Sequence, residues 1–289
     1  PSIDPRCPVW DDGTLYNMLQ REIKLPDPQA TGISNANAYL AQTKSSATVM
    51  HVSDQDQLQA IFNDRNTPNN TVIYVDNDFT ISKQIEIKSM NNQKTFTFTG
   101  NNPTVNVVKT TGRATFNLYA EGVVLNFDNI TISGTLPAGA AKNGGYKNQE
   151  PLNYGFIRLA YHSNAINTFD NFTFKNYQAV RTNAANAAFV YGDAGTCENH
   201  VNLVGGTFEN NAAASALVRF YDGSANLIRL YNPTIQNNIS LCDASIAIDS
   251  GSNRNYIALL GGKIVDNYNN GSWYNIRGVT NPLNHVDKQ

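Results

Sequence analysis

Arginine and tyrosine side chains recur in the middle of the chain, in strands that alternate apolar and polar residues. In LVRFYDGS, Val218 and Phe220 can face a core, so the residues between and after them point to the opposite side. Aromatic rings and guanidinium planes stack on sugar rings, and guanidinium groups also pair with carboxylate or sulfate. The pattern predicts an outward ledge that binds an acidic glycan, made of Arg158, Tyr161, Tyr191, Arg219 and Tyr221.

Other residues beside turns extend this candidate binding surface. They are Arg113 in TTGRATF, Arg254 in GSNRNY and Trp273 in NNGSWYN. A long Gly-rich segment, residues 137–155, also interrupts the strand pattern, and long loops on repetitive β proteins commonly shape a groove. Its candidate contact residues are Lys142, Tyr146 and Lys147.

A column of aspartates is the most enzyme-like feature of the sequence. Asp193, Asp222 and Asp249 each follow an apolar strand and recur at nearly equal intervals along the chain. Such carboxylates can bind calcium together with backbone oxygens, but DAG, DGS and DSG are also ordinary turn sequences. We therefore expect no catalytic residue, no metal ligand and no required cofactor, with calcium as the open alternative.

Composition excludes several other functions. The net charge is -2 and only 15% of residues are charged, so no polybasic surface for nucleic acid is expected. No apolar run reaches the roughly 20 residues that a membrane span needs, and PSIDPRCPVW lacks the features of a signal peptide, which indicates a matured or excised segment. Cys7, Cys197 and Cys242 show no metal-binding spacing, and are either small buried residues or include a Cys197–Cys242 bridge.

Five related segments indicate the elements that carry these residues. Their spacing shortens along the chain to a regular interval in the C-terminal half, which is typical of a β-solenoid with several short strands per coil. The copies are FDNITISG (127–134), FDNFTFKN (169–176), LVGGTFEN (203–210), LYNPTIQN (230–237) and LLGGKIVD (259–266).

The spacing inside each copy predicts a corner. Leu203 and Phe208 differ by an odd number of positions and can both face inward only if the strand bends between them, as Gly205 and Gly206 allow. Asparagines recur two positions after the second apolar residue, and we expect them to stack and hydrogen-bond from coil to coil. They are Asn176, Asn210 and Asn237.

Residues 1–66 have a helical rather than a strand pattern, which predicts helices over 11–24, 34–44 and 53–64. Ser53 is placed to cap the last of these helices, with Asp56 at the capping-box position. We therefore divide the chain into a helical and capping segment, 1–66, and a β-helix, 67–289.

GRATFNLYAEGVVLNFDNITISG and GGTFENNAA resemble the right-handed parallel β-helix of the pectate-lyase-like superfamily, particularly the binding regions of Gram-positive serine-rich repeat adhesins. VSDQDQLQAIFND resembles the helix that caps such solenoids. The resemblance covers roughly residues 50–280. It implies an all-β fold and a secreted or cell-wall-attached monomer, a non-catalytic adhesin region that binds an acidic or pectin-like polysaccharide or a host glycan in a shallow groove.

Two alternatives remain open at this point. One is a pectate-lyase-like polysaccharide lyase with a divergent, calcium-dependent site, although neither a WIDH-like stretch nor an Arg-x-Pro-x-x-Arg segment occurs in the sequence. The other is a structural solenoid or phage tail component that contacts only protein.

Overall fold

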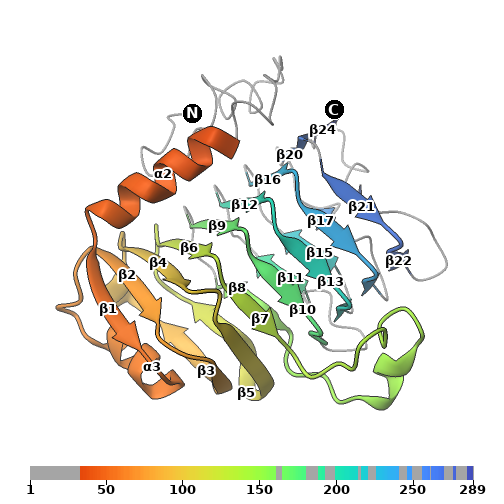
Figure 1. Ribbon diagram of the computed structural model, residues 1–289, viewed down its shortest axis with the longest axis horizontal. Coiled ribbons are helices and arrows are strands. Elements are labelled where there is room, and N and C mark those ends of the chain that lie inside the picture. Colours follow the sequence, from red (N-terminus) through yellow and green to blue (C-terminus); the bar gives the residue numbers. More distant parts are fainter. Residues whose placement is uncertain are drawn as a thin grey trace.

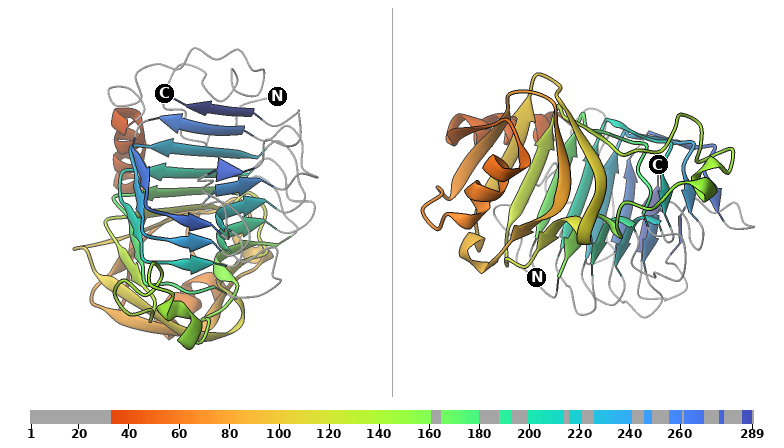
Figure 2. Two further views of the ribbon diagram at one scale, coloured as in Figure 1. Left: turned by 90° about the vertical axis from the view of Figure 1, so that its right-hand side faces the viewer. Right: turned by 90° about the horizontal axis from the view of Figure 1, so that it is seen from below.

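The computed structural model describes residues 33–160, 165–179, 188–192, 199–213, 216–220, 226–240, 246–248, 256–260, 262–269, 276–277 and 285–288. In these residues the strands stack in parallel from coil to coil, which confirms the predicted β-helix (Figure 1). Figure 2 shows the coils following one another from the orange N-terminal part to the blue C-terminal part. In the described part of the chain, no helix has the length and apolar character of a membrane span.

One face of the solenoid is a nine-stranded parallel sheet in which each coil contributes one strand. The first strand, β1, lies within the segment 1–66, for which only helices were predicted. It pairs in register with β2. In spatial order the strands are β1 (Thr48–Val52), β2 (Asn70–Val75), β4 (Thr95–Gly100), β6 (Val124–Asp128), β9 (Ile166–Asp170), β12 (His200–Val204), β16 (Leu227–Tyr231), β20 (Tyr256–Leu260) and β24 (His285–Lys288).

A twelve-stranded sheet forms the other walls, and β5 (Thr104–Leu118) connects its two halves by pairing with β7 at one end and β8 at the other. One half contains β21 (Lys263–Val265), β17 (Thr234–Gln236), β13 (Thr207–Glu209), β10 (Thr173–Lys175) and β7 (Thr131–Ser133). The other contains β8 (Gly155–Leu159), β11 (Ala188–Gly192), β15 (Ala216–Phe220), β19 (Ile246–Ile248) and β23 (Ile276–Arg277), while β3 (Phe79–Ile87) pairs with β5. A small third sheet contains β14 (Ala212–Ala213), β18 (Ile239–Ser240) and β22 (Tyr268–Asn269).

The predicted corner is confirmed. Leu203 and Phe208 are both fully buried, and Gly205 and Gly206 between them have φ of 61° and 79°. The same corner has positive φ in the neighbouring coils, where asparagine replaces the first glycine. These residues are Asn129 (φ 56°), Asn171 (φ 47°) and Asn232 (φ 59°).

The asparagine stack lies mainly one residue later than predicted. Asn210 Nδ2 does donate to Asn176 Oδ1 at 2.9 Å, but the continuous buried ladder joins Asn211, Asn238 and Asn267. Each amide Nδ2 donates to the next Oδ1, at 2.9 Å in both steps. Asn176, Asn210 and Asn237 instead occupy a left-handed backbone position, with φ between 54° and 58°. Asparagine tolerates this conformation better than most residues, which is why it recurs there.

Two α-helices precede or interrupt the first coils: α2 (Ile33–Ser45) and α3 (Gln55–Asn63). They confirm the helices predicted near 34–44 and 53–64, while the one predicted over 11–24 lies outside the described residues. The capping residue of α3 is Asp54, not Ser53, because Asp54 Oδ1 accepts from the Gln57 N–H at 2.8 Å. With Asp54 as the cap, Gln57 rather than Asp56 occupies the capping-box position, and its Oε1 accepts from the N–H of Ser53, the residue before the cap, at 2.7 Å. Two short 3-10 helices follow, η2 (Ser89–Asn91) and η3 (Gly145–Asn148).

The core is a stack of apolar rungs. Phe98, Phe127 and Phe169 are in register on adjacent strands, and their rings stack with centroids 4.6 and 5.1 Å apart. Leu203 and Leu230 continue this column. Burial of these large side chains stabilises the coils from β4 to β16 against one another.

One core rung departs from this pattern. Asn167 is in register between Leu125 and Val201 and is fully buried, yet neither its Nδ2 nor its Oδ1 has a hydrogen-bond partner. A buried amide without partners lowers stability.

Candidate functional site

The predicted arginine and tyrosine ledge is in register but is not exposed. Arg158, Tyr191 and Arg219 align on adjacent strands, opposite the core side chains Val190 and Val218. Their exposed fractions are only 4%, 1% and 9%. The prediction of a solvent-facing ledge is therefore wrong for these three side chains, because they are buried although they lie on the face opposite the core.

The contacts of Arg158 suit a structural role. Its Nη1 donates to Asn117 Oδ1 at 3.0 Å and to the Tyr119 hydroxyl at 3.2 Å, and its guanidinium lies 5.7 Å from the Tyr119 ring centroid. Hydrogen bonding to Asn117, and then to Arg158, lowers the pKa of Tyr119. The buried cation is thus satisfied by its own neighbours.

Of the other predicted contact residues beside the ledge, the structure describes only Arg113. Arg113 is exposed, and its backbone carbonyl accepts from the Tyr191 hydroxyl at 3.5 Å. The other predicted glycan contacts, the three aspartates of the predicted column and the three cysteines lie outside the described residues. They are Tyr161, Tyr221, Arg254, Trp273, Asp193, Asp222, Asp249, Cys7, Cys197 and Cys242.

An accessible groove lies instead beside the long connection between β7 and β8, here called the insertion loop (residues 134–154). In Figure 1 this yellow-green loop extends from the end of β7 along the side of the later coils. The loop and the solenoid enclose a volume of about 520 Å³, the insertion groove. It is lined by Ala138, Gly139, Lys142 and Asn143 from the loop and by Lys175, Asn176, Glu209, Asn210 and Asn237 from three successive coils.

Asn210 fixes the loop side of the insertion groove. Its Nδ2 donates to the Pro137 carbonyl at 2.8 Å, and its Oδ1 accepts from the Ala141 N–H at 3.0 Å. The left-handed corner turns this side chain toward the loop, so a residue type chosen for backbone geometry also positions the groove wall.

Apolar packing supports the same wall. Leu136, Ala140, Ala141 and Tyr146 of the insertion loop form a small buried cluster with Ala212. Tyr146, predicted as a contact residue, is therefore only 6% exposed and supports the loop from beneath. Of the other two predicted residues, Lys142 lines the groove, and Lys147 is exposed outside its lining.

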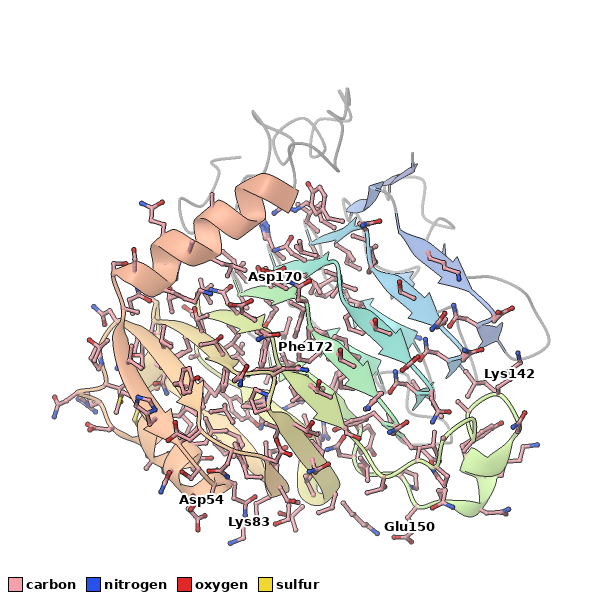
Figure 3. The ribbon with its side chains drawn as sticks, in the orientation of Figure 1. Asp54, Lys83, Lys142, Glu150, Asp170 and Phe172 are labelled. Atoms are coloured by element: carbon pink, nitrogen blue, oxygen red, sulfur yellow. The ribbon has the colours of Figure 1, made fainter. Side chains whose placement is uncertain are left out.

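A buried polar network holds the far end of the loop. The Tyr177 hydroxyl lies 2.7 Å from both Thr115 Oγ1 and Asn153 Oδ1, and Asn153 Nδ2 donates to Thr110 Oγ1 at 2.9 Å. Burial raises the pKa of Tyr177, so the hydroxyl keeps its proton. Outside this network, Lys109 and Glu150 form an exposed ion pair at 2.7 Å. Glu150 lies on the insertion loop in Figure 3. The loop is thus attached at both ends and in its middle.

The charged groups of the groove are two lysines and one carboxylate. Figure 3 shows Lys142 on the side of the loop that faces the later coils. Lys175 and Glu209 are in register on β10 and β13. Among the described residues, neither Lys142 nor Lys175 forms an ion pair. The groove can therefore offer two ammonium groups and several amides to a polar ligand.

Lys175 and Glu209 were missed by the sequence analysis, although a signal for them exists. They occupy the same position of the repeat, in TFKN and TFEN, directly after buried Phe174 and Phe208. Strand alternation places that position on the outside. What the sequence does not supply is the fold of the insertion loop, which alone makes this position part of a groove.

A separate carboxylate pair lies at the nine-stranded sheet. Asp128 and Asp170 are in register on β6 and β9, and Lys44 Nζ of α2 lies 2.5 Å from Asp128 Oδ2. Burial, followed by repulsion from Asp128, raises the pKa of Asp170 to about 6. The contact of Lys44 with Asp128 attaches α2 to the sheet. Both aspartates are buried, so the pair offers little access to a substrate.

No group of three or more acidic, histidine or cysteine side chains suited to a metal ion occurs among the residues that the structure describes. Comparison of the chain with protein-family models, with curated proteins and with solved structures finds no match.

Proposed function

We propose that this chain is a non-catalytic glycan-binding β-helix that recognises an acidic polysaccharide or host glycan in the insertion groove. The observation that carries the proposal is the groove itself, a polar channel between an anchored loop and three coils, with two lysines in its lining. In keeping with the adhesin resemblance, the binding region would act on a secreted or bacterial cell-surface protein, as a monomer.

The chemistry of the lining suits sugars. Amide side chains donate and accept hydrogen bonds, as vicinal hydroxyl groups require, and Asn143, Asn176 and Asn237 supply three of them. Lys142 and Lys175 add charge-assisted hydrogen bonds to a uronate or sulfate group. These contacts favour an anionic glycan over a neutral one.

The anchored loop favours binding energetically. Because Asn210 and the cluster around Tyr146 already hold the loop, little loop entropy is lost when a ligand enters. A preformed groove suits a protein that binds a polymer reversibly and leaves the polymer chemically unchanged.

Isothermal titration with oligogalacturonate tests the proposal. We expect measurable binding, weakened about tenfold by Lys142→Ala or by Lys175→Ala because each removes a charge-assisted contact. Lys147→Ala is the matched control, since Lys147 is exposed on the same loop but does not line the groove. Absence of binding to every acidic glycan tried, or equal binding by all three variants and the unaltered chain, would contradict the proposal.

Incubation of the protein with oligogalacturonate separates binding from catalysis. A lyase produces an unsaturated sugar that absorbs ultraviolet light, so absorbance that grows with time, with or without calcium, would replace the adhesin proposal by a lyase. We expect the absorbance to stay constant.

A further inference from the structure

We infer that the insertion groove selects polymers in which acidic and uncharged sugars alternate, and disfavours runs of consecutive acidic sugars. The inference rests on the proposed function and specifies its ligand. It comes from the order of charges along the solenoid axis, which a polymer lying in the groove would meet one after another.

The spacing of the coils suits a polymer that lies along the solenoid axis. Neighbouring strands of a parallel sheet lie about 4.8 Å apart, close to the advance per sugar of an extended hexose polymer. The groove is lined by residues from three coils, at Asn176, Asn210 and Asn237. A chain that follows the axis would therefore place about one sugar against each coil.

Two side chains of opposite charge lie in the groove on successive coils. Lys175 on β10 and Glu209 on β13 are in register, and both line the groove. Ser133 on β7 and Gln236 on β17 continue this register on either side, outside the groove lining, so uncharged residues flank the two charged positions. A uronate beside Lys175 is stabilised, and one beside Glu209 is repelled.

The orientation of Glu209 keeps the two charges separate. Gln236 Nε2 donates to Glu209 Oε2 at 3.3 Å, which holds the carboxylate toward the following coil. In the described part of the chain no ion pair joins Glu209 to Lys175. Because the two groups form no direct ion pair, the ammonium and the carboxylate each remain available to the sugar nearest to them.

The test compares two oligogalacturonates of equal length and linkage that differ only in charge pattern. One is fully acidic, and the other carries a methyl ester on every second carboxyl group. We expect the alternating oligomer to bind about tenfold more tightly, although it has half the charge. Glu209→Gln should raise affinity for the fully acidic oligomer about tenfold and change affinity for the alternating one less than about twofold.

The possible outcomes distinguish this inference from the proposed function. Equal or tighter binding of the fully acidic oligomer by the unaltered chain overturns the inference and leaves glycan binding intact. An equal effect of Glu209→Gln on both oligomers also overturns it. Failure of both oligomers to bind, with native circular dichroism retained, overturns the proposed function and this inference together.

Discussion

Asn210 Oδ1 accepts a hydrogen bond from the Ala141 N–H at 3.0 Å, although the two residues are far apart in the sequence. The contact joins a corner of one coil to the loop that leaves an earlier coil. Through it, the register of the solenoid determines the width of the insertion groove.

Asn210→Ala is therefore expected to loosen the loop. The substitution removes the bonds to Pro137 and Ala141, leaves a buried N–H without a partner, and costs about 1–3 kcal/mol locally. Hydrogen exchange should rise in residues 137–143, and glycan affinity should fall about tenfold. Asn237→Ala is the matched control for loop exchange alone, because its φ of 56° resembles the 54° of Asn210 while the side chain also lines the groove. Equal loop exchange in both variants would contradict this account of the groove.

Asn167→Leu is expected to stabilise the protein. The side chain lies between Leu125 and Val201 without a hydrogen-bond partner, and leucine is similar in size. Urea unfolding should show a gain of about 1–3 kcal/mol. Asn202→Leu should do the opposite, because Asn202 bonds to Thr168 and Arg229. A loss of stability in Asn167→Leu would show that this amide has a structural role.

Stability is expected to depend on pH through Asp170. Its pKa is raised from 3.8 to about 6 in the folded chain, so the folded state binds the proton more tightly than the unfolded state. This contribution is complete below about pH 4 and is lost as pH rises through about 6, amounting to about 3 kcal/mol. Unfolding followed across this range checks the prediction. Asp170→Asn should flatten the profile, whereas Asp56→Asn, at an exposed site on α3, should not. If the dependence of stability on pH were unchanged in Asp170→Asn, a group other than Asp170 would be its cause.

The buried ladder predicts a large penalty at Asn238. Asn238 Oδ1 accepts from the N–H and Nδ2 of Asn211, while its own Nδ2 donates to Asn267 Oδ1 and the Phe208 carbonyl. Asn238→Ala should lower the free energy of unfolding by about 3–5 kcal/mol, because several buried groups lose partners at once. Chemical denaturation measures the free energy of unfolding of this variant and of Asn237→Ala, which changes the adjacent residue outside the ladder. Similar losses in the two variants would count against a special role for the ladder.

The sequence was sufficient for the repeating part of the fold. The odd spacing of Leu203 and Phe208 predicted a bend that the left-handed Gly205 and Gly206 make. The asparagine ladder was misplaced by one position because Asn210 and Asn211 are adjacent and chemically identical. Only the backbone conformation separates the corner residue from the ladder residue.

The site was less predictable, for a different physical reason. Alternation correctly placed Arg219 on the face opposite Val218, but it does not reveal whether other segments cover that face. Lys142 was identified because its loop interrupts the repeat, whereas Glu209 became part of the groove only through the contact of Asn210 with that loop. The repeat alignment places Asp128 beside Asp170, but it does not reveal that both side chains are buried or that Lys44 of α2 contacts Asp128.

Hydrogen exchange of the chain with and without an acidic oligosaccharide tests the central claim most directly, because it locates the bound ligand. We predict slower exchange in residues 138–143 of the insertion loop and at the groove ends of β10 and β13, near Lys175 and Glu209. Protection confined to other parts of the solenoid, with these segments unchanged at saturating ligand, would contradict the assignment of the insertion groove as the glycan-binding site.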